Sequence, residues 1–265
     1  MNDASHSFAS YDVIGVPVTV TTPVLTAEAI ERWSHDSIGR FVCLRDVASL
    51  IAIRDDPEIA PLHRDASVIT PDGRPIAEMG KRRGLPVEQT SGYDLFDAVC
   101  KLSPDSGLKH YIYGGQEGVA QELADIMRSK YPGISIVGVE TPPMGDPHDW
   151  EAEATRERIL ASGADVVWVG LSSPRQDVWM WRNHTSLPQT LIGIGAAFDF
   201  HTGRKQRAPR IVRVLMLEWL FRLLAEPKRL WKRYLLMLPR FVWLAVLDKG
   251  RRERRKRSRE DIPAE

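Results

Sequence analysis

Short apolar runs alternate with longer amphipathic stretches along most of the chain. The stretches 119–131 and 150–162 place apolar residues at the spacing of one helix face. The short runs are rich in β-branched and aromatic residues, and they lie at 41–44, 66–70, 110–113, 134–139, 165–171 and 190–197. The alternation predicts an α/β fold with a mostly parallel sheet and helices on both faces. Residues 11–22 predict a peripheral strand or hairpin, followed by a helix that starts at Thr26.

The pattern changes in the last quarter of the chain. From 207 onward the sequence is helical in spacing, aromatic and basic, and Pro209, Pro227 and Pro239 are expected to mark helix starts or breaks. The final stretch is a block of charges, which is typical of disorder. We therefore expect three parts: an α/β core at 1–206, a helical appendage at 207–248 and a basic, disordered tail at 249–265.

The formal net charge of +1 is the sum of two parts with opposite signs. Residues 225–259 hold 13 Lys and Arg against 3 acidic residues, whereas residues 1–224 hold 23 basic against 29 acidic residues. This asymmetry predicts an anionic partner for the basic part. Its interleaved Trp, Tyr and Leu favour an anionic membrane surface over a nucleic acid, and a merely solvated face is the plain alternative.

Composition excludes several classes of protein. Two cysteines, Cys43 and Cys100, are too few for a disulfide framework or a structural zinc site, so we expect reduced thiols in a cytoplasmic protein. The first residues do not resemble a secretory signal, and no uncharged apolar run reaches the roughly 20 residues of a spanning helix. The seven histidines are scattered without metal-ligand spacing, so we predict no metal and no cofactor.

Residues that directly follow strands are the candidates for chemistry, because open parallel sheets bind ligands at the carboxyl ends of their strands. Asp72 lies in Thr70-Pro71-Asp72-Gly73, after the second predicted strand of the sheet. Its carboxylate suits a general base at that edge. A Pro-Asp-Gly turn without any function explains the same four residues.

Three further segments carry weaker signals. The glycines of 114–118 let a backbone approach a phosphate, but the spacing is not G-x-G-x-x-G and a plain turn fits equally. In 170–176, Ser173 and Gln176 fit a helix capping box, or else Gln176 or Arg175 faces a phosphate or sugar. Asp199 either binds a ligand or caps backbone amides.

Taken together and in order, these segments resemble the WecG/TagA/CpsF family of bacterial glycosyltransferases. The resemblance covers most of residues 40–235. The matching segments are TPDGRPIAEMGKRRGLPVEQTSGYDL, YIYGGQEGVAQELADIMRSKYPGISIVG, DVVWVGLSSPRQDVWMWRN, IGIGAAFDFHTGRKQRAP and LEWLFRLLAEPKRLWKRY. It implies a Rossmann-like core that binds a sugar nucleotide and a C-terminal appendage that completes the active site.

The resemblance also implies an activity and a set of site residues. The activity is inverting, metal-independent transfer of a sugar from a UDP-sugar to a polyprenyl-diphosphate-linked saccharide at the cytoplasmic face of the membrane. Asp72 matches the family's general base, and Gln176 matches a glutamine that lines the pocket. The other residues expected at the substrates are Cys43, Arg45, Thr70, Gly73, Gly114, Gly115, Gly118, Ser173, Asp199, Arg222, Arg229 and Lys232.

The chain departs from the family pattern at two places. Cys43 and Arg45 stand where the family often has Thr and Asn, both of which face the pocket. A cationic Arg45 would pair with an anionic sugar or a phosphate, which Asn does not do. Lys232 stands where Arg is usual, and the adjacent Arg233 offers a substitute.

The sequence therefore predicts a peripheral-membrane glycosyltransferase of exopolysaccharide or cell-surface polysaccharide biosynthesis. The alternative is a non-catalytic nucleotide-binding or scaffold protein of a polysaccharide assembly complex. A nucleic-acid binder is a third class, and the acidic core and the aromatic residues of the appendage argue against it. The apolar appendage also leaves a homo-oligomer open.

Overall fold

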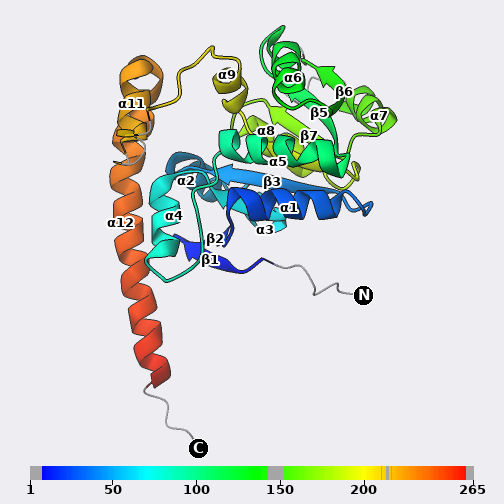
Figure 1. Cartoon of the computed structure of the whole chain (residues 1–265). Coiled ribbons are helices and arrows are strands. Elements are labelled where there is room, and N and C mark those ends of the chain that lie inside the picture. The colour runs from blue at the N-terminus through cyan, green and yellow to red at the C-terminus, as the bar shows by residue number, and fades with distance from the viewer. Residues whose placement is uncertain (1–7, 143–151, 210, 213–214, 216, 261–265) are drawn as a thin grey trace, which may run out of the picture.

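The computed structural model describes residues 8–142, 152–209, 211, 212, 215 and 217–260. Its centre is a six-stranded sheet in the order β4-β3-β8-β7-β5-β6, and every neighbouring pair is parallel (Figure 1). The strands are β3 (Arg40–Arg45), β4 (Val68–Pro71), β5 (Lys109–Gly114), β6 (Ser135–Glu140), β7 (Val166–Gly170) and β8 (Thr190–Gly193). All six predicted strands are confirmed, although β8 ends at Gly193, where the chain turns toward a short helix.

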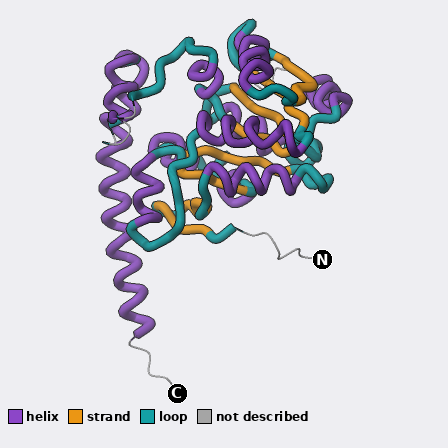
Figure 2. Tube along the Cα trace, viewed as in Figure 1, coloured by secondary structure: helices purple, strands orange, loops and turns teal. Residues whose placement is uncertain are grey.

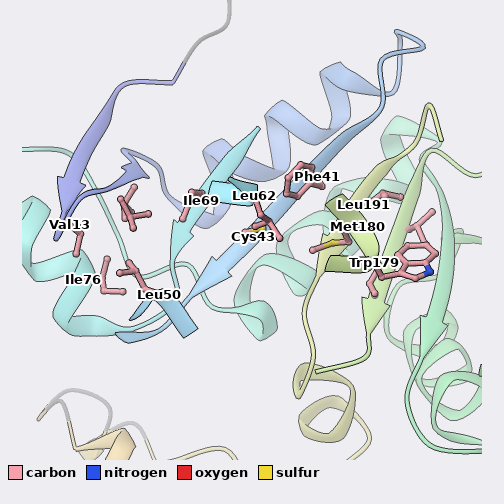
Figure 3. Close-up of a cluster of buried hydrophobic side chains, with 14 of the residues drawn as sticks. Val13, Phe41, Cys43, Leu50, Leu62, Ile69, Ile76, Trp179, Met180 and Leu191 are labelled. Carbon is pink, nitrogen blue, oxygen red and sulfur yellow. The ribbon is translucent and has the colours of Figure 1, made fainter. Parts of the chain in front are cut away.

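Helices cover both faces of the sheet, as the apolar strands predict (Figure 2). The side chains of β3 alternate between two buried clusters, so that Phe41 and Cys43 join one and Val42 and Leu44 the other. The first cluster (Figure 3) includes side chains of α2 (Val47–Asp55), α3 (Leu62–Asp65), α4 (Arg74–Lys81), α7 (Ala152–Ser162) and α8 (Arg175–Asn183). The second includes side chains of α1 (Pro23–Trp33), α5 (Gly92–Ser106), α6 (Val119–Lys130) and α9 (Ala197–His201).

The amino-terminal segment forms the expected hairpin. Strands β1 (Ser10–Val13) and β2 (Val16–Thr19) pair antiparallel and pack into the first cluster. The following helix α1 begins at Pro23 and not at Thr26. The earlier start has a local cause: the Thr22 hydroxyl caps the helix by accepting a hydrogen bond from the amide of Leu25 at 3.1 Å, and proline is well tolerated in the first turn.

The C-terminal part consists of α11 (Glu218–Ala225) and the long helix α12 (Pro227–Glu260), which lies beside α2 (Figure 1). Pro227 begins α12 as predicted, but the predicted break at Pro239 is wrong. Met237, Phe241 and Leu244 pack on the first cluster on both sides of this proline. Their packing outweighs the local cost of proline in a helix, about 3 kcal/mol.

Helix α12 also continues into the block of charges that was expected to be disordered, and it ends at Glu260. On the sides that face away from the core, α12 exposes a set of large apolar residues, and all of them except Trp231 lie between two basic regions, 228–233 and 249–259. They are Trp231, Leu235, Leu236, Val242, Trp243, Val246 and Leu247. No helix in the described part of the chain is long and apolar enough to cross a membrane.

Candidate active site

A cleft of about 860 Å³ opens at the carboxyl ends of the strands. Its volume lies in the range of small-molecule sites, roughly 300–1,000 Å³. Residues that follow different strands line it, among them Asp46 after β3, Asp72 after β4, Gly115 after β5, Ser173 after β7 and Ile194 after β8. The connection from β5 runs outward to β6 while that from β7 runs the other way to β8, so the two neighbouring strands form a topological switch point. Such points are where open sheets bind ligands.

Backbone hydrogen bonds fix the turn that carries Asp72. The amides of Asp72 and Gly73 both donate to the carbonyl oxygen of Arg45, at 3.0 and 3.2 Å. The Gln89 side chain donates to the Asp72 carbonyl oxygen at 2.7 Å. The Asp72 carboxyl is therefore held at the floor of the cleft, at the end of β4.

The environment of Asp72 raises its pKa to about 7. Burial is the largest cause, followed by the negative charges of Asp46 and Glu218, while Arg222 acts in the opposite direction and Asp94 adds to the rise. Asp46 is itself fixed, because its carboxylate caps α2 by accepting from the amide of Ser49 at 2.7 Å. A carboxyl group that titrates near neutral pH is suited to general-base catalysis.

A pH profile tests this environment. We expect kcat/KM to fall as the pH drops below about 7, because the raised pKa of Asp72 leaves the base protonated there. Asp46→Asn keeps the cap of α2 but removes the negative charge that raises the pKa of Asp72 most, so it should lower this pKa and move the acidic limb to lower pH. Asp125→Asn, on the exposed side of α6, is the control. An acidic limb that stays in place in Asp46→Asn would contradict the assignment.

Gln176, near the start of α8, also lines the cleft. Its side chain lies against Gly193 and Gly195. An added Cβ would lie 3.0 Å from Gln176 Nε2 at Gly193 and 3.2 Å from Gln176 Oε1 at Gly195. The Oε1 atom is buried and has no hydrogen-bond partner among the described residues. Buried polar atoms are usually paired, so this oxygen is suited to accept from a ligand hydroxyl.

The predicted capping box at α8 is wrong. The helix begins at Arg175, Pro174 is its N-cap, and no side chain of the described residues caps it. The Ser173 hydroxyl donates instead to the Asp177 carboxylate at 2.6 Å. Ser173 and Arg175 both line the cleft, which agrees with the ligand interpretation of this segment.

Of the glycines at 114, 115 and 118, Gly115 alone lines the cleft in the described structure. Its amide donates to the Gly170 carbonyl oxygen at 3.0 Å, which ties the end of β5 to that of β7. Gly114 permits this approach, because a Cβ there would lie 2.7 Å from the Gly170 backbone. Gly118 adopts a left-handed conformation as the N-cap of α6. Gly114 and Gly118 thus have structural roles, and their expected contact with a substrate stays a prediction.

Arg45 does not reach the cleft, contrary to expectation. Its side chain is fully buried, and its Nη1 donates to Asp177 at 2.8 Å while its Nε donates to His63 Nε2 at 3.0 Å. Burial and the charge of Arg45 lower the pKa of His63 to about 3, so the imidazole is neutral and accepts this bond. The guanidinium therefore pairs with an internal carboxylate and not with a phosphate or an anionic sugar.

Cys43 and Thr70 are also buried beneath the cleft. Cys43 lies in the first cluster near Phe41 and Leu62 (Figure 3), and burial raises the pKa of its thiol to about 12. The Thr70 hydroxyl donates to the carbonyl oxygen of Thr90 at 3.0 Å. Both residues were expected to contact a substrate, but neither lines the cleft in the described structure.

Cationic side chains line the wall opposite the sheet. Arg222 on α11 lies close enough to Asp72 to lower its pKa. Asp199 also lines this wall, and it pairs with Lys205 at 2.9 Å. The side chains of Arg229 and Lys232, two other residues expected at the substrate, lie outside the described residues, and their backbone belongs to α12.

The structure adds cleft residues that the sequence analysis did not single out. Asp46 follows β3 directly, so the rule that pointed to Asp72 would also have found it. Arg207 has no local signal, because its place depends on residues distant in sequence. It donates to both carboxylate oxygens of Asp94, at 2.6 and 2.8 Å, and it lies over the ring of Tyr93. Within the described residues, no group of three or more His, Cys, Asp or Glu side chains is placed to hold a metal ion.

Comparisons with known proteins agree with this geometry. A sequence profile of the Glycosyl transferase WecG/TagA/CpsF family matches residues 11–256, which include the whole cleft and nearly all of α12. An N-acetylglucosaminyldiphosphoundecaprenol N-acetyl-beta-D-mannosaminyltransferase of Bacillus spizizenii is 30% identical over 215 residues, which is 80% of this chain and 80% of that protein.

Proposed function

Because the chain belongs to the WecG/TagA/CpsF family of glycosyltransferases, we propose that it moves a sugar from a UDP-sugar to a polyprenyl-diphosphate-linked saccharide. The product would be an intermediate of exopolysaccharide or another cell-surface polysaccharide. The observation that carries the proposal is the placement of Asp72, whose pKa is raised to about 7, opposite Arg222 in a cleft of nucleotide-sugar size. The Bacillus relative, by its name, acts on a saccharide linked to diphosphoundecaprenol.

The proposed reaction is a single displacement with inversion. Asp72 takes the proton of the acceptor hydroxyl as that oxygen attacks the anomeric carbon, and the bond from that carbon to the diphosphate oxygen breaks. UDP leaves with the bonding electron pair, and the proton stays on Asp72. The proposal assigns stabilisation of the leaving diphosphate to Arg222 and the amide of Gly115, and not to a metal ion.

Two kinds of side chain in the cleft suit the two halves of the donor. Gln176 Oε1 and the Ser173 hydroxyl offer neutral polar atoms, which suit sugar hydroxyls. Arg175 and Arg222 offer positive charge, which suits the diphosphate. Arg45 is buried outside the cleft, so it would influence the donor only through Asp177 and Ser173.

We place the protein peripherally on the cytoplasmic face of the membrane, where the lipid-linked acceptor is embedded. The support is the exposed apolar side of α12 between its basic regions, the arrangement of helices that lie in a membrane interface. Anionic lipids attract nearby Lys and Arg by about 1 kcal/mol each. The acidic core and this apolar side argue against a nucleic-acid partner.

Binding to lipid vesicles tests this placement. The double variant Leu236→Ser/Trp243→Ser should bind vesicles of phosphatidylglycerol and phosphatidylcholine at least about tenfold more weakly, because it removes two side chains that are 65% and 61% exposed on α12. Leu25→Ser, which is 44% exposed on α1, is the matched control and should bind normally. Equal binding by the unsubstituted protein, the double variant and Leu25→Ser would exclude α12 as the membrane contact.

A donor screen separates the enzyme from the scaffold alternative. The full chain is incubated with single UDP-sugars and a polyprenyl-diphosphate saccharide, and released UDP is measured. We expect acceptor-dependent release from at least one UDP-sugar. Binding of UDP without release from any sugar in a broad panel would favour the non-catalytic scaffold.

A further inference from the structure

A second, smaller cavity lies between the α/β core and the C-terminal helices. Its volume is about 90 Å³, and it is formed where α2 and the start of α4 face α11 and α12 (Figure 1). It shares Asp46, Asp72, Glu218 and Arg222 with the catalytic cleft, so the two spaces meet at the proposed base. None of the steps proposed above uses this cavity.

The walls of this cavity differ in chemistry from those of the cleft. Its charged lining residues are Arg74 and the four residues that it shares with the cleft. The rest of the lining is largely apolar and comprises Val47, Ala48, Pro75, Trp219, Met237 and Leu238. A volume of about 90 Å³ is too small for a whole ligand of drug size, which needs roughly 300 Å³ or more. The cavity therefore suits an apolar part of a ligand whose polar part lies in the cleft.

Helix α12 continues this apolar lining to the outside of the molecule. Leu238 lines the cavity, and residues three or four positions apart share one side of a helix. On the side of Leu238 lie Leu235 and Val242, with Trp231 one turn further along, and all three are exposed. An apolar path thus leads from the base, along the cavity, to the helix side proposed to contact the membrane.

We propose that this cavity is the subsite for the first isoprenoid units of the acceptor lipid. The inference rests on the proposed function and adds to it where the lipid lies. With its diphosphate near Arg74, which lines this cavity, the acceptor would place its saccharide in the cleft at Asp72 and its first isoprenoid units against Met237 and Leu238. The acceptor lipid and the UDP-sugar then enter from different sides. The isoprenoid chain extends outward along α12, while UDP-sugar exchanges through the cleft.

Binding of a short soluble prenyl diphosphate tests the subsite without turnover. The full chain is saturated with UDP to fill the donor site, and is titrated with geranyl diphosphate and, separately, with inorganic diphosphate. We expect geranyl diphosphate to bind at least about tenfold more tightly, a difference of about 1.4 kcal/mol. Equal affinities in a protein that binds UDP would overturn the subsite and leave the proposed function standing. Failure to bind UDP would overturn both.

Two substitutions in the cavity and one control localise the effect. Ala48→Leu fills the cavity and should abolish most of the tenfold preference, and Leu238→Ala removes one wall and should reduce it at least about threefold. Leu25→Ala, at an exposed position of α1 that does not line the cavity, should keep the preference. Thermal unfolding and UDP titration identify variants that are folded. Full preference in folded Ala48→Leu and Leu238→Ala would overturn the proposal.

Discussion

Asp72→Asn should lower kcat by about 100- to 10,000-fold, the contribution that a positioned general base makes. Asparagine has nearly the same shape but takes up no proton at neutral pH, so the acceptor hydroxyl would attack without losing its proton to the enzyme. The turn should persist, because its backbone is held by the Arg45 carbonyl oxygen and the Gln89 side chain, and the substitution leaves these hydrogen bonds in place. UDP affinity should therefore change little.

Steady-state kinetics and UDP titration on the same preparation check this prediction. Asp105→Asn, at an exposed position near the end of α5, is the matched control and should have normal kcat. Near-normal turnover by Asp72→Asn would remove Asp72 as the base. A loss of UDP affinity equal to the loss of kcat would assign the residue to donor binding instead.

Arg45→Met should lower the free energy of unfolding by about 3–5 kcal/mol, because it leaves the Asp177 carboxylate buried without its positive partner. The pair is fully buried, with Arg45 Nη1 and Asp177 Oδ1 2.8 Å apart, so water cannot replace the lost interaction. Urea unfolding measures the difference. If both members are replaced, in Arg45→Met/Asp177→Leu, much of the loss should be recovered, since no unpaired charge then remains.

The same strand offers the control for this prediction. Arg40 pairs with Asp36 at 2.6 Å at the other end of β3, but this pair is partly exposed to solvent. Arg40→Met should therefore cost no more than about 1 kcal/mol. If Arg45→Met and Arg40→Met cost the same, the buried pair does not stabilise the fold in the way its geometry indicates.

The sheet was predictable because its signal is local and repeated. Each strand is a short apolar run, and alternation with helices is enough to indicate a parallel sheet with two covered faces. The position of Asp72 followed from that topology, since residues after parallel strands meet at one edge. Pro239 shows where local rules fail. A proline predicts a break, but packing of Met237 and Phe241 on the core keeps the helix continuous.

The behaviour of Arg45 was not predictable because its partners are distant in sequence. Asp177 lies 132 positions away and His63 lies 18 positions away, and no local pattern connects them. The family often has Asn at this position, so the sequence alone indicated that Arg45 makes a new ligand contact. The structure instead places the cation within a buried pair that supports Ser173 from beneath.

The raised pKa of Asp72 also depends on residues that are distant in sequence. Its rise depends on burial, on Asp46 after another strand, and on Glu218 from α11, while Arg222 on α11 opposes it. Both α11 residues also line the cavity that α12 closes. The C-terminal part, which the sequence marks mainly by its charge, thus contributes to the chemistry of the base as well as to the proposed membrane contact.

The most direct test of the proposed function is the mass of the product. The full-length protein is incubated with a panel of UDP-sugars and polyprenyl-diphosphate saccharides, with Asp72→Asn in parallel, and the lipid fraction is analysed by mass spectrometry. We predict that one acceptor gains the mass of a single sugar residue, that UDP appears in equal amount, and that Asp72→Asn forms almost none of this product. An unchanged acceptor across the whole panel, or equal product from Asp72→Asn, would contradict the account.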